Sequence, residues 1–437
     1  MTFRKIRIGV FSIIVSLGTT MGYAGDRDGG SVDGHKLAGN LLAYPYMNEE
    51  PPVQTPAPAG YKPFHLEHYG RHGSRWLIGE NDYLTPVRQL EKAERAGKLT
   101  PLGVKTLAAL RDMAEGSVGR CSELTDLGAL QHQRIGRRMA TNYPEIFNAA
   151  ADIDAKSTVV IRCILSMANG LEGIQQVSPG VRAKKDASYA DMWFMNYDDK
   201  PAWMVKDSAE KAVVEPWKAK RHGSRDFLAR LVTDPQFARD SVEPGIMPYL
   251  YWVLGSMQGH VGKPWLLEDV FSETDLIENW EGGNAFWFMH SGDTPMSLHR
   301  MPYTQRKLLG RMIEQTDSAV LSKRPSARLR YGHDGILVNL VTLMELGDYG
   351  KEVTDLDQLE EIGWRDYDII PMAGNLQLVF YRPEGSTNPD DVLVKALLNE
   401  REIALPGTPV SGPYYSWKEL RKYYSDKLEG FEKRFKE

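Results

Sequence analysis

The order of apolar and polar positions predicts strands and helices that alternate along the chain. Phe64, Leu66 and His68 would share one face of a first strand. The pattern predicts strands over 63–69, 327–331 and 376–381, helices over 125–140 and 335–346, and a polar helical tail from Ser416. The stretch 157–168 fits either a strand or the start of a helix. Alternation of this kind predicts an α/β fold with a largely parallel central sheet flanked by helices.

The middle of the chain has a different pattern. Residues 178–320 are rich in Trp and Tyr, carry interspersed charges and show helical patches such as 227–232 without clear strands. We therefore expect an inserted, mainly helical lid domain over 178–320, between the two parts of an α/β core, 61–177 and 321–437. Residues 25–60, rich in Gly and Pro, predict an extended lead-in.

The first 24 residues have the order of a secretory signal peptide. Three basic residues precede an apolar stretch from Ile8 to Leu17, and small residues follow at Gly22 and Ala24. No later segment approaches the roughly 18 uninterrupted apolar residues of a membrane helix. These features predict a secreted or periplasmic protein that does not bind a membrane.

Charge and cysteine content narrow the choice of partners. The net charge is −5, and loss of the basic leader would make it more negative, so neither nucleic acid nor an anionic membrane is an expected partner. Cys121 and Cys163 are the only cysteines. Neither follows the leader, which excludes a lipoprotein anchor. Whether they form a disulfide, and the oligomeric state, stay open.

Two short motifs stand where predicted strands end. Arg71 and Arg75 bracket His72 after the first strand, and His333-Asp334 follows the strand over 327–331. Ligands of parallel α/β sheets bind beyond the carboxyl ends of the strands. Hydrolysis of a phosphate monoester needs cations for the oxygens, a nucleophile, and an acid for the leaving group. The two motifs contain all three kinds of group.

Further motifs make the pattern more specific. They are Arg71-His72-Gly73-Ser74-Arg75, Leu124-Thr125-Asp126-Leu127-Gly128, Ser157-Thr158 with Arg162, and His333-Asp334. On these residues, in this order, the chain resembles the acid phosphatase and phytase branch of the histidine phosphatase superfamily. The resemblance implies an α/β domain with a helical insertion that forms a lid over the pocket.

The resemblance also implies roles for six residues. His72 would be the nucleophile that becomes phosphorylated, and Asp334 the proton donor. The phosphate ligands would be Arg71, Arg75, Arg162 and His333. The substrate would be a small phosphorylated molecule, possible cases being phytate and other inositol or sugar phosphates. No cofactor is expected and no metal, since no cluster of His, Asp and Glu has the spacing of metal ligands.

Several alternatives remain beside this interpretation. Arg221 to Arg225 repeat the first motif, but no predicted strand precedes them, so we favour the first copy as catalytic. His333 could be a core histidine and Asp334 a helix cap. Lysines in the middle region, among them Lys184 and Lys220, could bind further phosphates or form a solvated face.

Function also has alternatives. The chain could be a phosphate-binding protein without turnover, or a transferase like phosphoglycerate mutase. The related multiple inositol polyphosphate phosphatases carry His-Ala-Glu, whereas this chain has His333-Asp334-Gly335. The sequence alone therefore does not assign it to that group.

Overall fold

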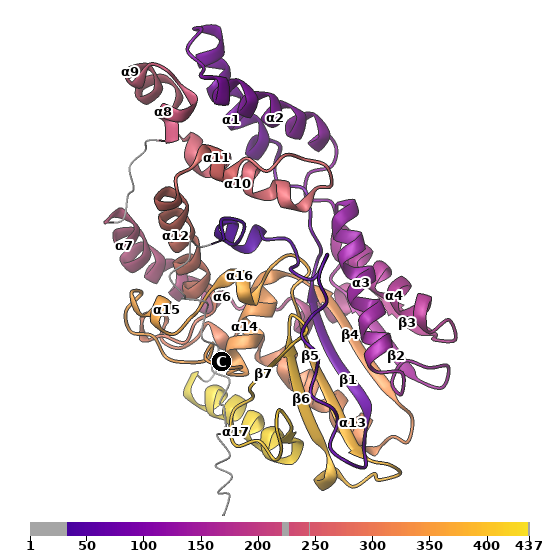
Figure 1. Cartoon of the computed structure of the whole chain (residues 1–437). Helices are drawn as coiled ribbons and strands as arrows, with labels where there is room; N and C mark the ends of the chain where they lie inside the picture. Colours follow the sequence, from indigo (N-terminus) through magenta and orange to yellow (C-terminus); the bar gives the residue numbers. More distant parts are fainter. Residues whose placement is uncertain (1–32, 221–226, 244, 436–437) are drawn as a thin grey trace, which may run out of the picture.

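The structure, a computed structural model, describes residues 33–220, 227–243 and 245–435. One sheet lies at the centre of the lower part of the molecule, and a group of helices extends from it (Figure 1). The strands are β1 (Tyr61–Arg71), β2 (Asp152–Ser157), β3 (Ala183–Asp186), β4 (Ser326–Gly332), β5 (Asn375–Pro383), β6 (Leu393–Leu398), β7 (Arg401–Ile403) and β8 (Tyr415–Ser416). The predicted signal peptide and the second Arg-His-Gly-Ser-Arg lie outside the described residues.

The sheet has a parallel half and an antiparallel half. Its order is β3-β2-β4-β1-β5-β6-β7, with β8 paired to β6. The strands β3, β2, β4 and β1 are parallel neighbours, whereas β5 runs antiparallel to β1, and β6 and β7 continue that half. The predicted α/β class with a largely parallel centre is confirmed, with the antiparallel strands added at one side.

The longer helices are α1 (Glu80–Arg95), α2 (Pro101–Ser117), α3 (Asp126–Asn142), α4 (Ile161–Val177), α6 (Lys200–Ala209), α10 (Ile246–Ser256), α12 (Glu273–Ser291), α13 (Arg306–Leu321), α14 (Asp334–Leu343) and α17 (Trp417–Phe435). Shorter ones are α5 (Met192–Met195), α7 (Glu215–Ala219), α8 (Phe227–Leu231), α9 (Pro235–Phe237), α11 (Leu267–Val270), α15 (Gln358–Glu361) and α16 (Asp366–Ile369). The helix predicted over 125–140 is confirmed as α3. Thr125 Oγ1 caps its amino terminus by accepting from Gly128 N.

The stretch 157–168, for which the sequence favoured either a strand or the start of a helix, contains the end of a strand and the start of a helix. β2 ends at Ser157, and α4 begins at Ile161, after a bend at Val159 and Val160. The predicted strand over 63–69 exists but continues to Arg71. Phe64 and Leu66 do not share a face, since they pack in different core clusters. The cause is a shift in the pairing of β1 with β5 between Pro63 and His65, which breaks the period of two.

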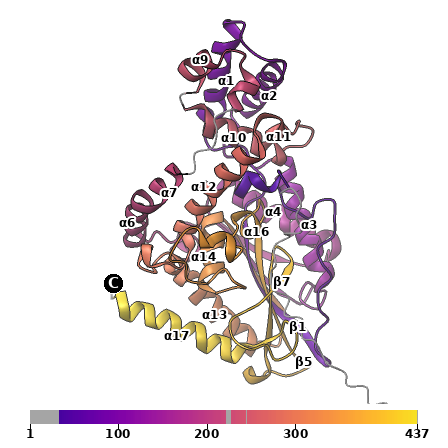
Figure 2. The same ribbon diagram turned by 60° about the vertical axis from the view of Figure 1, so that its left-hand side comes forward.

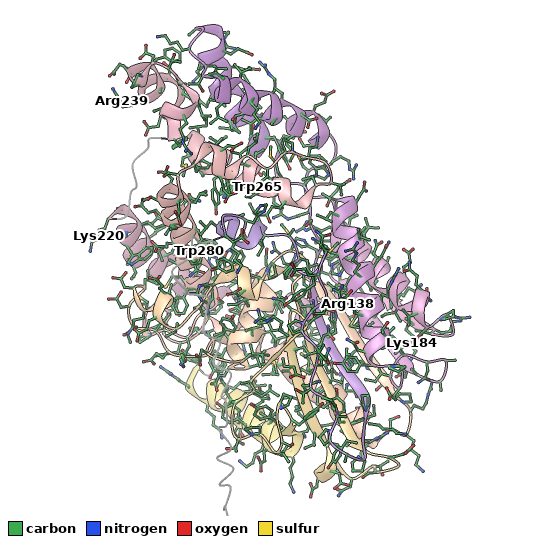
Figure 3. All side chains as sticks on the ribbon, viewed as in Figure 1. Arg138, Lys184, Lys220, Arg239, Trp265 and Trp280 are labelled. Atoms are coloured by element: carbon green, nitrogen blue, oxygen red, sulfur yellow. The ribbon has the colours of Figure 1, made fainter. Side chains whose placement is uncertain are left out.

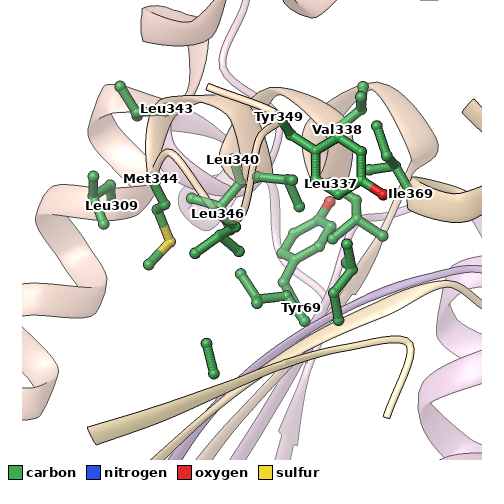
Figure 4. Packing of buried hydrophobic residues seen from close by; sticks show 14 of the residues in the cluster. Tyr69, Leu309, Leu337, Val338, Leu340, Leu343, Met344, Leu346, Tyr349 and Ile369 are labelled. Atoms are coloured by element: carbon green, nitrogen blue, oxygen red, sulfur yellow. The ribbon is translucent and has the colours of Figure 1, made fainter. Parts of the chain in front are cut away.

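Both faces of the sheet are covered by helices. On one face, Leu66 of β1 and Leu329 of β4 belong to a buried cluster with residues of α3 and α4. On the other, Tyr69 of β1 packs under α14, next to Leu337 and Leu340 (Figure 4). α14 is therefore a buried helix, and the site that follows β1 and β4 stands on a rigid base.

The helices α1, α2, α8, α9, α10 and α11 form a separate group at the end of the molecule, which we call the helical unit (Figure 1 and Figure 2). Its cluster of buried residues includes Leu90, Leu110, Leu231 and Leu254, which come from two distant segments of the chain. The segment predicted as a helical lid contributes only part of this unit. It also contains one strand, β3, which pairs with β2 in the core sheet.

The lead-in differs in part from the extended segment that its composition predicts. Lys36–Leu41 form a short 3₁₀ turn, in which Leu37 and Ala38 are buried against the helical unit. Gly39 has a φ of 58°, which kinks this turn and suits a glycine. Over the part of the chain that the structure describes, no helix has the length and apolar character needed to cross a membrane.

Candidate active site

Three adjacent parallel strands carry the predicted site residues at their carboxyl ends. Arg71 is the last residue of β1 and pairs with Gly332, the last residue of β4. His72 N donates to Gly332 O at 2.9 Å, which joins the first motif directly to the second. On the other side of β4, β2 leads through Thr158 to α4, whose second residue is Arg162. The fold thus brings together segments that lie up to 260 residues apart.

His72 is buried, and its ring has a defined tautomer. Nδ1 lies 2.9 Å from Gly73 O, and a carbonyl can only accept, so Nδ1 carries the proton. Nε2 therefore keeps its lone pair. Burial, followed by the charges of Arg71, Arg75 and Arg162, lowers the pKa of His72 well below its ordinary value. The ring stays neutral, as a nucleophile requires.

The three arginines surround this ring with donors. Arg71 is fully buried, and its Nη1 donates to Asn40 O at 2.7 Å and to Ile370 O. Arg75 Nη1 donates to Trp76 O at 3.0 Å. Each of Arg71, Arg75 and Arg162 keeps a buried Nε without a partner among the described residues. Buried guanidinium nitrogens of this kind suit the oxygens of a phosphate group.

His333 faces His72 from the end of β4. The two ring centroids are 5.9 Å apart, with the rings nearly perpendicular. Thr158 Oγ1 lies 3.2 Å from His333 Nε2, and the backbone N of His333 donates to Tyr69 Oη at 3.1 Å. Burial lowers the pKa of His333 to about 4, so the neutral ring can donate one N–H to an anion. The alternative that His333 is a core histidine does not explain why its ring faces that of His72.

Asp334 begins α14 beside the arginines. Its Oδ2 lies 2.8 Å from Arg71 Nη2, and its Oδ1 accepts from Gly335 N at 2.9 Å. Burial alone would raise the pKa of Asp334, but the charges of Arg71 and Arg75 outweigh burial and lower it. The carboxyl group is consequently ionised before any substrate binds.

The loop that carries His72 packs against α3 and α4. Gly73 N donates to Ser166 Oγ at 3.1 Å, and Ser74 N donates to Gln131 Oε1 at 2.8 Å. A Cβ on Gly73 would lie only 2.4 Å from Gly128 O, so the backbones approach more closely than any other residue would allow. A Cβ on Gly128 would in turn lie 2.2 Å from Ser74 O, so this close approach requires a glycine at both positions.

The structure brings together His72, Asp334, Arg71, Arg75, Arg162 and His333, the six residues singled out from the sequence. It adds groups for which the sequence gave no role: Asn40 O, Ile370 O and Ser122, whose Oγ accepts from Arg162 Nη1 at 2.6 Å. Carbonyl groups have no signal in a sequence. Thr158 belongs to one of the motifs named from the sequence, and that motif is the signal from which its contact with His333 could have been predicted.

The structure also shows the state of the two cysteines and of two lysines in the middle region. Cys121 and Cys163 are free thiols, and burial raises the pKa of Cys163 to about 11, which makes a thiolate nucleophile there unfavourable. Lys184 and Lys220 point away from the molecule, as expected of solvated side chains (Figure 3). Within the described ranges, no three His, Cys, Asp or Glu side chains form a group that could hold a metal ion.

The fold, with Arg-His-Gly-x-Arg and His-Asp at adjacent strand ends, is shared with multiple inositol polyphosphate phosphatases and phytases of known structure. Comparisons with known proteins confirm the predicted resemblance to the acid phosphatase and phytase branch of the histidine phosphatase superfamily, and with it the prediction of an enzyme of the histidine acid phosphatase type. No family model matches the chain.

Multiple inositol polyphosphate phosphatase 1 of Gallus gallus is 24% identical in an alignment 417 residues long, and the match covers 88% of each chain. The multiple inositol polyphosphate phosphatase of Bifidobacterium longum, solved with phosphate, superposes with a TM-score of 0.72 at 18% identity. That match covers 89% of this chain and 97% of the other. The phytase of D. castellii gives a TM-score of 0.66 at 15% identity, over 91% of this chain and 86% of its own. These similarities to two multiple inositol polyphosphate phosphatases are found although His333-Asp334-Gly335 differs from the His-Ala-Glu expected of that group.

Proposed function

We propose that the protein hydrolyses phosphate monoesters through a phosphohistidine on His72. The proposal is supported above all by one observation. His72 Nδ1 is held by Gly73 O, and this contact leaves the Nε2 lone pair free beside three arginines, each with a buried Nε that has no partner in the described part of the chain. Such an arrangement offers a nucleophile and a cationic field to the same phosphorus atom.

In the first step, the lone pair of His72 Nε2 forms a bond to phosphorus. The bond from phosphorus to the ester oxygen breaks, and a proton from Asp334 goes to that oxygen. Arg71, Arg75, Arg162 and His333 bind the non-bridging oxygens. In the second step, water attacks phosphorus and gives a proton to the Asp334 carboxylate. The phosphorus–nitrogen bond then breaks and inorganic phosphate leaves.

Asp334 can act as an acid only when it holds a proton, and in the free enzyme its pKa is lowered. A bound phosphate dianion would compete with Asp334 for Arg71 and add negative charge beside the carboxyl group. Both effects raise the pKa of Asp334 in the complex. We therefore propose that the enzyme works at acidic pH.

The proposed substrates are inositol polyphosphates, including phytate. Two of the similar proteins are named as multiple inositol polyphosphate phosphatases, and a third as a phytase. The test is a panel of phytate, simple sugar phosphates and a chromogenic aryl phosphate. A kcat/KM for phytate at least tenfold above that for sugar phosphates supports this substrate class, whereas the reverse order contradicts it. No turnover of any ester would contradict the phosphatase itself.

We also propose that the protein is exported, on the order of basic, apolar and small residues over 1–24. Sequencing of the amino terminus after expression with the native leader tests this proposal. Mature protein that begins near Gly25 in the external or periplasmic fraction would support it. An intact Met1 on protein retained in the cytoplasm would contradict it.

A further inference from the structure

The guanidinium of Arg162 is held by one serine. Arg162 Nη1 donates to Ser122 Oγ at 2.6 Å and lies 3.5 Å from Ser122 O. Among the described residues no other side chain hydrogen-bonds to this group, and its Nε is buried without a partner. Arginine has many rotamers, so a side chain fixed by one contact depends on that contact for its direction.

Ser122 adopts a backbone conformation that serine usually avoids. Its φ is 71°, in the left-handed region where a Cβ is unfavourable. The neighbouring chain imposes this conformation, because Ser122 N donates to Leu77 O at 2.8 Å and Trp76 N donates to Glu123 O at 2.9 Å. Glycine would fit this position without strain. A strained residue whose side chain meets a site residue is typical of functional sites.

We propose that Ser122 is a positioning residue for Arg162: its hydroxyl oxygen holds Nη1, so that the Nε side of the guanidinium faces the phosphate. This inference rests on the proposed function, since Arg162 is a phosphate ligand there. Ser122 itself does not touch the substrate in this arrangement. It acts by keeping Arg162 in one orientation before the substrate binds, which lowers the ordering cost of binding.

The serine also links the site to the helical unit. The segment that contains Ser122 and Glu123 returns from α2 and pairs with Trp76 and Leu77, which lead into α1. The orientation of Arg162 on α4 is therefore set by the segment in which the chain returns from α1 and α2 of the helical unit to the site.

The first test is Ser122→Gly. We expect kcat/KM for an aryl phosphate to fall about tenfold, with most of the loss in KM, and the Kd of inorganic phosphate to rise by a similar factor. The Tm should stay within about 2 °C of the parent or rise, because glycine relieves the left-handed strain. Ser122→Asn should remain within about threefold of the parent, since asparagine tolerates this backbone and offers an amide oxygen to Arg162.

A double-mutant cycle separates positioning from general damage. In an Arg162→Ala background, Ser122→Gly should change kcat/KM and the phosphate Kd by less than about twofold, because the group that it orients is gone. An independent tenfold loss in that background would overturn the inference. So would parent-like kinetics and phosphate binding of Ser122→Gly in the wild-type background.

Leu298→Gly is the matched control, because Leu298 is exposed, has a φ of 56° and lies outside the site. It should relieve the same kind of strain without a change in phosphate affinity. A loss of affinity equal to that of Ser122→Gly would show an effect of the glycine itself and would overturn the inference. If the parent protein turns over no ester, the proposed function fails, while the phosphate Kd values still decide the role of Ser122.

Discussion

Arg71 and Asp334 form an ion pair, with Nη2 and Oδ2 2.8 Å apart, although 263 residues separate them in the sequence. The pair is possible because β1 and β4 are parallel neighbours that end at the same register. In the free protein this contact holds Asp334 as a carboxylate. Under the proposed mechanism, a substrate phosphate that binds Arg71 would weaken this pair and add negative charge beside Asp334, and both effects would favour the protonated carboxyl group.

The pH dependence of the two kinetic constants should differ for this reason. The ratio kcat/KM reports the free enzyme, in which the pKa of Asp334 lies below its ordinary value, and kcat reports the complex, in which phosphate raises it. We expect the decline of kcat with rising pH to occur at a higher pH than that of kcat/KM. Steady-state kinetics from about pH 3 to about pH 8 give the pH profiles of kcat and of kcat/KM. If kcat and kcat/KM declined at the same pH, the result would contradict a substrate-induced rise in the pKa of Asp334.

Replacement of Asp334 by Asn should affect poor leaving groups most. An alkoxide from a sugar or inositol leaves slowly without a proton, so Asp334→Asn should slow those substrates by on the order of a hundredfold or more. A nitrophenolate needs little protonation, and the loss should be much smaller. Single-turnover phosphorylation makes the comparison. Equal losses for both classes would mean that Asp334 positions the substrate and that another acid acts.

His72→Ala should abolish turnover, because it removes the ring whose Nδ1 is held by Gly73 O and whose Nε2 lone pair lies beside the arginines. The matched control is His222→Ala, in the second copy of the motif, which should keep most of the activity. Acid-labile phosphate on the protein, trapped after rapid mixing, should be present in the control and absent from His72→Ala. Activity that survives the first change, or is lost only with the second, would contradict the choice of site.

Catalysis should survive exhaustive chelation. Arg71, Arg75 and Arg162 supply the positive charge that metal ions give other phosphatases, and the neutral ring of His333 adds a hydrogen-bond donor. The measurement is kcat on an aryl phosphate before and after dialysis against a chelator, with a change of less than about twofold expected. A loss that added zinc or magnesium restores would contradict this mechanism.

Stability should fall as the solution becomes acidic. Burial lowers the pKa of His68 and His132 to about 3 and that of His260 and His333 to about 4. The unfolded chain binds protons at these histidines below about pH 6.5, whereas the folded protein does not, so each costs about 1.4 kcal/mol per pH unit between the two pKa values. Urea denaturation at several pH values measures this slope.

His132→Gln should reduce that slope by removing one such group, with activity at neutral pH as the check on folding. An unchanged slope would show that His132 is protonated in the folded state. The working pH of the enzyme and its pH of greatest stability are then different, and the acidic limit of activity is set in part by unfolding.

The elements that the sequence predicted are those with a local signal. β4 was visible because Ala327, Leu329 and Tyr331 alternate with polar residues, and all three are buried. The alternation was nevertheless incomplete evidence. Arg330 is also buried, where it forms an ion pair with Glu67 of β1, so both faces of the strand are covered. A polar residue that is buried with a partner looks like a surface residue in the sequence.

The residues of the site could be predicted because their motifs are compact and stand at strand ends. Their supports could not. Asn40 O and Ile370 O hold Arg71 through backbone groups, and any residue type could supply a carbonyl. Ser122 meets Arg162 only because the chain returns from α2 to pair with Leu77. Contacts of this kind depend on tertiary pairing, for which one sequence carries no periodic signal.

The helical unit joins α1 and α2 to α8 and α10, and so belongs to two separate stretches of the chain. The helical unit therefore cannot be removed by deleting one continuous segment of the chain. Removal of the later stretch would leave Leu90 and Leu110 facing water, and each fully buried leucine contributes on the order of 2 kcal/mol. A shortened form without residues 178–320 would therefore aggregate rather than yield a minimal phosphatase, and any graft of this unit onto another enzyme must transplant both stretches together.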